Sequence, residues 1–313
     1  MRHDTTVGDY VYVSIEKPRR DKEKVEVTGH DKPKGMTGIA TFNMKVTSEY
    51  LFVGDGRQDY SQEYQEAYHR FFRSKEQLTI PGTTLKGAVR SVAEAISNSC
   101  ISVRSWNDRR KLGKYPKCRV PKTRNKKKIK ICPACRIFGT TDYKGHISFS
   151  DALPDGSIES RIIKIAELWR PRKLILKRKF YKSGKYIDLR DQSPEMNYRY
   201  IEAVPKNSIF TFNLFFENAQ ESDLSLVFHS MGINQDFEIK VGGAKPRCLG
   251  NVSFEAKKIK VVEQLIDSEE KDPENFLGKI LKNECLIKSE KLKELTKNIS
   301  SKTACTGGQS QWK

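Results

Sequence analysis

The fold is decided by residues 78–96, whose sequence is LTIPGTTLKGAVRSVAEAI. A Pro-Gly pair ends an apolar approach, and Thr83 or Thr84 can cap a helix that begins near Leu85. Apolar residues then recur at helical spacing, which gives the helix one face for the core. The stretch predicts a strand end, a tight turn and an amphipathic helix.

The first turns of this helix carry two cations on the side away from the core. Lys86 and Arg90 lie four residues apart and so project in register. Gly87 costs a helix about 1 kcal/mol relative to Ala, and Lys86 faces the positive end of the helix dipole. Both residues are explained if a polyanion binds here, because Gly87 lets it come close to backbone N–H groups and Lys86 adds a positive charge. An ordinary surface helix with an unfavourable glycine is the alternative.

The composition favours a polyanionic partner. The 313 residues hold 58 Lys and Arg against 39 Asp and Glu, which gives a net charge of +19. Nucleic acid is the first candidate, although anionic membranes and heparin-like chains attract the same charge. No apolar run of bilayer-spanning length and no secretory signal segment are visible, so we expect a cytoplasmic protein with no membrane partner.

The seven cysteines point to metal binding. Their number is odd and no signal segment is visible, so a disulfide framework is not expected. In the sequence CPAC, the spacing of Cys132 and Cys135 lets both thiolates bind one tetrahedral zinc ion. Cys100 and Cys118 complete the predicted set, with His146 as the alternative to Cys100. A redox pair or free thiols are the competing interpretations.

Two segments are unusually basic. Residues 104–130 hold thirteen Lys or Arg and one acid, so the zinc site is expected to hold together an insertion that cannot fold alone. Residues 161–199 hold twelve Lys or Arg and four acids, interleaved with apolar and aromatic residues around a Ser-Gly turn. This pattern predicts a protruding hairpin. Like charges on paired strands favour an anionic ligand there over a solvated hairpin without function.

Hydrophobic patterning predicts the remaining elements. Alternating residues predict strands at 38–47, 146–151 and 209–216, and residues 50–53 are expected to continue the first strand. Residues 57–77 have tyrosines at helical spacing and predict a loop with a short helix, in which the rings either pack or stack on bases. Helices are predicted at residues 223–237, 261–266, 276–285 and 291–299, and the end from Ser300 is expected to be disordered.

Residues 241–250, with the sequence VGGAKPRCLG, predict a glycine-rich loop. Gly242 and Gly243 would bring backbone N–H groups beside phosphate, and Lys245 and Arg247 would add positive charge. The loop matches neither a Walker motif nor a dinucleotide-binding motif. It therefore indicates an anion site without identifying the anion.

Taken in order, five motifs resemble those of the RAMP superfamily. They are LFVGDG at 51–56, IPGTTLKGAVR at 80–90, CPACRIFG at 132–139, EAVP at 202–205 and GGAKPRCLG at 242–250. The resemblance covers roughly residues 38–254. It is closest to the backbone subunits of type III and related type VII CRISPR effector complexes.

The resemblance implies an α+β fold, a ferredoxin-like, RRM-type palm with a zinc-stapled insertion and a basic thumb hairpin. Residues 1–99 would form the first part of the palm, with an inserted loop at 57–77, and residues 100–135 the basic zinc-binding insertion. Residues 136–255 would complete the palm and include the thumb hairpin at 161–200. Residues 256–313 would form a Lys/Glu-rich helical extension with a disordered end.

The resemblance also implies a function. Subunits of this family stack head to tail along a CRISPR RNA and present it for pairing with target RNA. The implied partners are CRISPR RNA, target RNA, further copies of the chain, other RAMP subunits and, where the subunit does not cut, a separate nuclease. The residues implied to contact RNA are Lys86, Gly87, Arg90, Gly242, Gly243, Lys245 and Arg247, with Arg170, Arg172, Lys173, Lys177 and Arg178 in the thumb hairpin.

Family members that cut target RNA use an Asp between the first strand and the helix, together with a divalent metal such as Mg²⁺. Asp59 is the best match and Asp55 the next, but their loop is longer and more aromatic than the family's loop. We therefore expect a subunit that holds RNA, with cleavage at Asp59 as the alternative. A third hypothesis is guide processing by His or Tyr acid–base chemistry, for which no histidine pairing is evident.

Overall fold

A computed structural model describes residues 6–7, 10–14, 25–26, 30, 34–100, 118, 120, 130–168, 177–184, 198–264, 267–300 and 305. Most of the basic insertion and of the predicted thumb hairpin lie outside these residues. The predicted RNA contacts Arg170, Arg172 and Lys173 and the side chain of Lys177 are among those not described. Apart from Cys305, the end predicted to be disordered after Ser300 also lies outside the described part.

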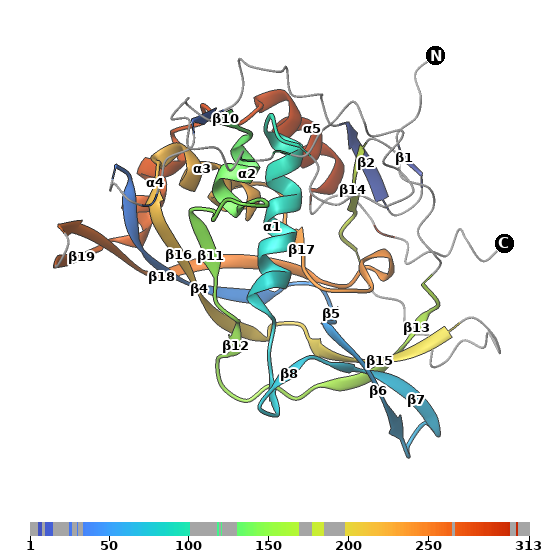
Figure 1. Cartoon of the computed structure of the whole chain (residues 1–313). Helices are drawn as coiled ribbons and strands as arrows, with labels where there is room; N and C mark the ends of the chain where they lie inside the picture. The colour runs from blue at the N-terminus through green and yellow to red at the C-terminus, as the bar shows by residue number, and fades with distance from the viewer. Residues whose placement is uncertain are drawn as a thin grey trace, which may run out of the picture.

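A seven-stranded antiparallel sheet forms the centre of the fold (Figure 1). Its long strands are β4 (Met36–Val46), β16 (Ile209–Ala219) and β18 (Asn251–Gln264), with β4 in the middle. The short strands β11 (Ile147–Phe149) and β12 (Leu153–Pro154) pair with β16. The strands β17 (Ile239–Lys240) and β19 (Asp267–Lys271) pair with β18. The predicted strands at 38–47 and 209–216 are therefore confirmed.

Five helices cover one side of this sheet, and its other side carries none of them (Figure 1). They are α1 (Gly82–Ile96), α2 (Pro133–Phe138), α3 (Glu221–Ser230), α4 (Pro273–Leu281) and α5 (Ser289–Ile299). The ring of Phe42 on β4 stacks on Phe212 of β16 at 5.7 Å and meets Phe228 of α3 at 6.1 Å. This arrangement confirms the predicted α+β class.

Helix α1 buries the predicted face, including Leu85, Val89 and Val92, but its start differs from the prediction. The helix begins at Gly82, and neither threonine caps it. Instead, the Gly82 N–H donates to the Asp151 carboxylate at 2.8 Å. A Cβ on Gly82 would lie 2.3 Å from the Phe149 carbonyl oxygen, so the close approach of that segment requires glycine.

A second sheet of five strands replaces the loop and helix predicted at 57–77. Strands β6 (Gly54–Ser61) and β7 (Glu66–Phe71) form a hairpin, and β7 pairs in parallel with β15 (Tyr198–Pro205). Strand β13 (Arg161–Ala166) pairs with the other edge of β15. The predicted helix is wrong because tyrosines four residues apart share a side of a strand as well as of a helix.

The second sheet also accounts for residues 50–53, which were expected to extend the first strand. Strand β5 (Tyr50–Leu51) leaves β4 and pairs with β15. A three-stranded sheet joins β1 (Thr6–Val7), β2 (Tyr10–Ser14) and β14 (Lys177–Tyr181). Two further pairs join β3 (Val25–Glu26) with β10 (Lys130–Ile131) and β8 (Arg73–Ser74) with β9 (Gln77–Leu78). Thus Arg178 lies on a strand paired with the N-terminal segment.

The helices predicted at 276–285 and 291–299 correspond to α4 and α5, whereas the one predicted at 261–266 is wrong. Strand β18 continues through this segment, because pairing with β4 and β19 outweighs local helix propensity. Helix α3 ends at Ser230, well before the predicted end, and Gly232 follows with a left-handed φ of 82°. No helix among the described residues has the length and hydropathy needed to cross a bilayer.

A disulfide joins Cys248 and Cys305, so the protein has one such bond although no disulfide framework was expected. The two residues lie 57 positions apart in the sequence. The Cys305 N–H donates to the Ser183 carbonyl at 2.7 Å, so Cys305 lies beside the end of β14 as well as the glycine-rich loop. An odd total number of cysteines therefore did not exclude a single pair.

Removing the Asp151 carboxylate should destabilise the start of α1. In Asp151→Ala the Gly82 N–H loses its acceptor, and we expect the free energy of unfolding to fall by about 0.5–2 kcal/mol. Urea denaturation followed by circular dichroism measures the change. Asp155→Ala removes another exposed carboxylate of the same segment and should cost less than about 0.5 kcal/mol. Equal losses in the two variants would contradict the cap.

Candidate nucleic-acid interface and cysteine cluster

Lys86 and Gly87 present an open, positively charged surface on the first turns of α1. The Lys86 side chain is partly buried and makes no hydrogen bond or ion pair with the described residues. Burial and the nearby charge of Arg90 lower the pKa of Lys86. A Cβ on Gly87 would meet no atom of the described residues within 4 Å, so none of them requires glycine there.

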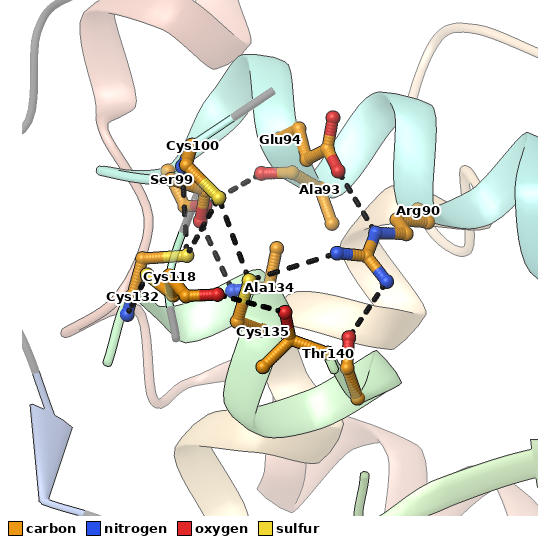
Figure 2. A network of polar contacts seen from close by, with 12 residues as sticks. Arg90, Ala93, Glu94, Ser99, Cys100, Cys118, Cys132, Ala134, Cys135 and Thr140 are labelled. Atoms are coloured by element: carbon orange, nitrogen blue, oxygen red, sulfur yellow. Dashed lines mark hydrogen bonds and ion pairs between the residues drawn. The ribbon is translucent and has the colours of Figure 1, made fainter. Parts of the chain in front are cut away.

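Arg90, by contrast, points into the protein (Figure 2). Its guanidinium donates to the Glu94 carboxylate at 2.8 Å, to the Gly139 carbonyl at 2.9 Å and to the Cys135 sulfur at 3.7 Å. The first contact lies within α1, and the other two join α1 to the end of α2 and to the cysteines. The geometry gives Arg90 a positioning role between these elements.

Glu94 is fully buried and lies between two guanidinium groups. Its second carboxylate oxygen pairs with Arg178 of β14, which the sequence placed among the RNA contacts of the thumb hairpin. Burial, and after it the charge of Arg90, lowers the pKa of Arg178 to about 10. The pairing therefore fastens β14 to α1 and directs the Arg178 guanidinium inward.

Four cysteines converge at the end of α1 and the start of α2. The sulfurs of Cys100, Cys118, Cys132 and Cys135 all lie within 4.8 Å of one another. The Cys100 and Cys135 sulfurs are 3.4 Å apart and the Cys132 and Cys100 sulfurs 3.7 Å, close to the separation of about 3.8 Å in a tetrahedral zinc site with bonds of about 2.3 Å. The donor set can therefore hold one metal ion.

The thiols interact as one unit. Hydrogen bonds with Cys100 and then Cys132 lower the pKa of Cys118, and the contact with Cys100 raises the pKa of Cys132. Backbone N–H groups also donate to the sulfurs, from Cys132 to Cys118 at 3.3 Å and from Cys100 to Cys132 at 3.5 Å. Donors of this kind orient the thiolates of metal sites. The convergence of four sulfurs favours a metal site over a redox pair.

His146, the predicted alternative to Cys100, belongs to a different group. Its ring Nδ1–H donates to the Glu217 carbonyl at 2.8 Å, its Nε2 shares a hydrogen bond of 2.7 Å with the Tyr143 hydroxyl, and the ring centroid lies 4.9 Å from that of His30. Burial lowers the pKa of His146. The His30 ring nitrogens contact Glu217 and the Lys144 carbonyl. The sequence did not reveal this pairing, and both rings are engaged by protein groups.

The glycine-rich loop is shaped by its contact with Phe52. Gly242 has a left-handed φ of 81°, and a Cβ there would lie 2.0 Å from the Phe52 carbonyl oxygen. The Gly243 N–H donates to the same oxygen at 2.8 Å, so this donor is used inside the protein. The loop is closed by a bond of 2.8 Å from the Val241 N–H to the Gly250 carbonyl. The glycines thus provide close packing between two segments.

The two cations of this loop have different environments. Arg247 is buried and donates to the Ala166 carbonyl at 3.1 Å and the Glu167 carbonyl at 2.6 Å, which anchors the loop to the end of β13. Lys245 makes no hydrogen bond or ion pair within the described part of the chain. Burial lowers the pKa of Lys245 to about 8. Lys245 is therefore a partly desolvated cation that an anion could satisfy.

Asp55 and Asp59, the predicted catalytic candidates, lie on β6. Asp59 accepts from the Tyr60 N–H at 2.8 Å and from the Tyr68 hydroxyl at 3.5 Å, and Asp55 accepts from the Arg57 N–H at 2.7 Å. Across the described ranges, the four cysteines form the only group of three or more ligand side chains that converge on one point. Neither aspartate belongs to a preformed group of this kind.

Substituting Gly242 should lower the free energy of unfolding by more than the cost of its left-handed backbone angle alone. Gly56 has a similar φ of 83° but open space around it, so Gly56→Ala should cost about 1–2 kcal/mol of unfolding free energy. We expect Gly242→Ala to cost at least about 1 kcal/mol more, because the new Cβ displaces the Phe52 carbonyl. Chemical denaturation of both variants gives the comparison, and equal losses would contradict the contact.

Comparison with known proteins identifies the family. The chain of one solved structure, a cryo-EM structure of the type III-B Cmr-beta bound to cognate target RNA, is 17% identical with a TM-score of 0.39. The similarity covers 72% of this chain and 61% of that chain, so less than two thirds of the relative's length is represented. No curated protein matches. The family model of the RAMP superfamily matches residues 43–253, more than half of the sequence, and the chain therefore belongs to the RAMP superfamily.

Proposed function

We propose that this chain is a CRISPR RNA-binding backbone subunit of an RNA-guided effector complex. It would hold the guide RNA for pairing with target RNA, and the proposal assigns it no cleavage step. Membership of the RAMP superfamily provides the framework for this proposal. The observation that carries it is the pair of partly buried lysines, Lys86 and Lys245, that have no partner among the described residues.

Each of these lysines is suited to an RNA phosphate. Burial lowers the pKa of both, which means that their charged forms are poorly solvated in the free protein. An anion beside a desolvated ammonium stabilises its charged form. Because Gly87 leaves the surface next to Lys86 open, a phosphate could approach the helix closely. A net charge of +19 would attract the whole strand.

The two lysines belong to neighbouring parts of the fold. Strand β17 contacts α1, and the glycine-rich loop that carries Lys245 follows β17 directly. The loop is also bonded to Phe52, which follows β5. These contacts support one RNA path over α1 and the loop. We propose that Arg90 and Arg247 act from inside the protein, by holding these two segments in place.

The proposal extends to partners and location. We infer that the central sheet and its helices form the RRM-type palm of the family, and that copies of the chain stack along the guide with other RAMP subunits. A subunit that only holds RNA would require a separate nuclease to cut the target. Such a complex would work in the cytoplasm.

We also propose that the four-cysteine cluster binds structural zinc. All four donors are thiols, their sulfurs lie within 4.8 Å of one another, and backbone N–H groups donate to two of them. Zinc would supply no chemistry to the RNA. It would fix the ends of the basic insertion to the segment that also receives Arg90.

RNA binding by the purified chain tests the first proposal. Lys86→Ala and Lys245→Ala should each weaken binding of a labelled single-stranded RNA. Each should also reduce the slope of log K against log salt by about 0.7, the value for one phosphate contact on a single strand. Fluorescence anisotropy at several salt concentrations measures both effects. Lys206→Ala, which removes an exposed lysine from the turn after β15, is the control and should bind like the wild type.

The pH dependence adds a second readout. Lys245 is charged below its pKa of about 8, so RNA affinity should fall as the pH rises through that value. Lys245→Arg should keep the affinity and lose this fall, since arginine stays charged. Unchanged affinity and salt slope in both alanine variants would overturn the proposed RNA path.

Metal analysis tests the zinc proposal. The wild-type chain should contain about one zinc per chain, and cobalt substitution should give the absorption bands of a tetrahedral thiolate site. Cys132→Ser should abolish both signals and lower thermal stability. Cys285→Ser, which changes an exposed free cysteine, is the control and should leave metal content unchanged. Equal metal content in the two variants would disprove the site.

A further inference from the structure

We propose that the outer face of the β13–β15–β7–β6 sheet is a second RNA contact, on which tyrosine rings stack with bases of a single strand. Four tyrosines gather there, Tyr64, Tyr68, Tyr198 and Tyr200. The proposal goes beyond the phosphate path described above, because it concerns another surface and another kind of interaction.

Strand register places the tyrosines together. Tyr200 of β15 lies opposite Lys164 of β13 on one side and opposite Tyr68 of β7 on the other, so all three side chains share a face. The next residue of β15, Ile201, pairs with Ile163 of β13, and both are buried on the reverse face. In Figure 1 this sheet lies at the lower right, away from the helices. The tyrosine face is therefore the outer one.

The rings form a continuous aromatic surface that remains partly exposed. Tyr64 stacks on Tyr200 with ring centroids 5.1 Å apart and planes 24° apart. Tyr198 meets Tyr200 edge to face at 5.8 Å. Rings that only completed a core would be buried, whereas all of these are partly accessible. Exposed aromatic rings on a sheet are a common platform for unpaired bases.

The cations and acids of this face nearly balance. The Lys164 ammonium lies 4.0 Å from the centre of the Tyr198 ring, and Arg70 beside Tyr68 makes no hydrogen bond or ion pair with any residue that the structure describes. The acids are engaged: Glu66 accepts from the Tyr198 hydroxyl at 2.8 Å, and Asp59 from the Tyr68 hydroxyl. With few net charges, this face would bind mainly through stacking.

Substitution of one ring tests the proposal in the full-length chain. The probe is a single-stranded RNA with 2-aminopurine, whose fluorescence falls on stacking. Tyr200→Leu should weaken binding by about fivefold or more, the effect of losing one stacked base, and reduce the quenching. It should leave the salt slope unchanged, whereas the lysine variants reduce that slope. Tyr200→Phe keeps the ring and should behave like the wild type.

Tyr60 provides the matched control. It is 60% exposed on the same hairpin but pairs with Ala67, which puts it on the reverse face, so Tyr60→Leu should bind normally. An RNA of the same length without bases should bind Tyr200→Leu and the wild type with equal affinity. If Tyr200→Leu does not fold, Tyr198→Leu at the start of β15 replaces it.

Three outcomes would overturn the proposal. The first is wild-type affinity and quenching in the leucine variants. The second is an equal loss of affinity for abasic and normal RNA. The third is a changed oligomeric state of the leucine variants without a change in RNA binding, which would make this face a contact between copies. A loss limited to the lysine variants would reject stacking and keep the phosphate path. A loss of affinity limited to the tyrosine variants would reject the phosphate path and keep stacking.

Discussion

The Glu94 carboxylate, buried between Arg90 and Arg178, joins three parts of the fold. Through Arg90 it reaches the Gly139 carbonyl and the cysteine cluster, and through Arg178 it reaches β14. A buried carboxylate is costly to desolvate and is tolerated only when its partners are held in place. The charge group therefore requires α1, the cysteine cluster and β14 to take one mutual arrangement.

This constraint explains how the chain divides its cations. Arginines with several planar donors serve the interior, where Arg90 and Arg247 bond to carbonyl oxygens of neighbouring segments. Lysines, which are compact point charges, remain available at Lys86 and Lys245. A count of basic residues in a motif cannot make this distinction. As a result, one cation of a basic motif can be structural while its neighbour remains available to a ligand.

The sequence predicted α1 because local periodicity and tertiary burial agree there, as Leu85 and Val89 show. It missed the cap, because Asp151 lies 69 residues from Gly82 and no local pattern contains that contact. All four cysteines of the cluster were predicted, but the choice between Cys100 and His146 could not be made from spacing, because it depends on how the chain folds back. Similarly, tyrosine spacing could not tell the β6–β7 hairpin from a helix. The strand structure depends on pairing with β15, which is far away in the sequence.

The two proposed RNA surfaces share one support. Ala244 and Leu249 of the glycine-rich loop pack against Ile163 and Ile201 on the inner face of the second sheet. The tyrosines lie on the outer face of that same sheet. A strand held by charge near the loop and bases held by stacking on the tyrosines would therefore be fixed relative to each other by a packed core. Because the phosphate path should depend on salt more strongly than the stacking surface, moderate salt should weaken the first contact more than the second.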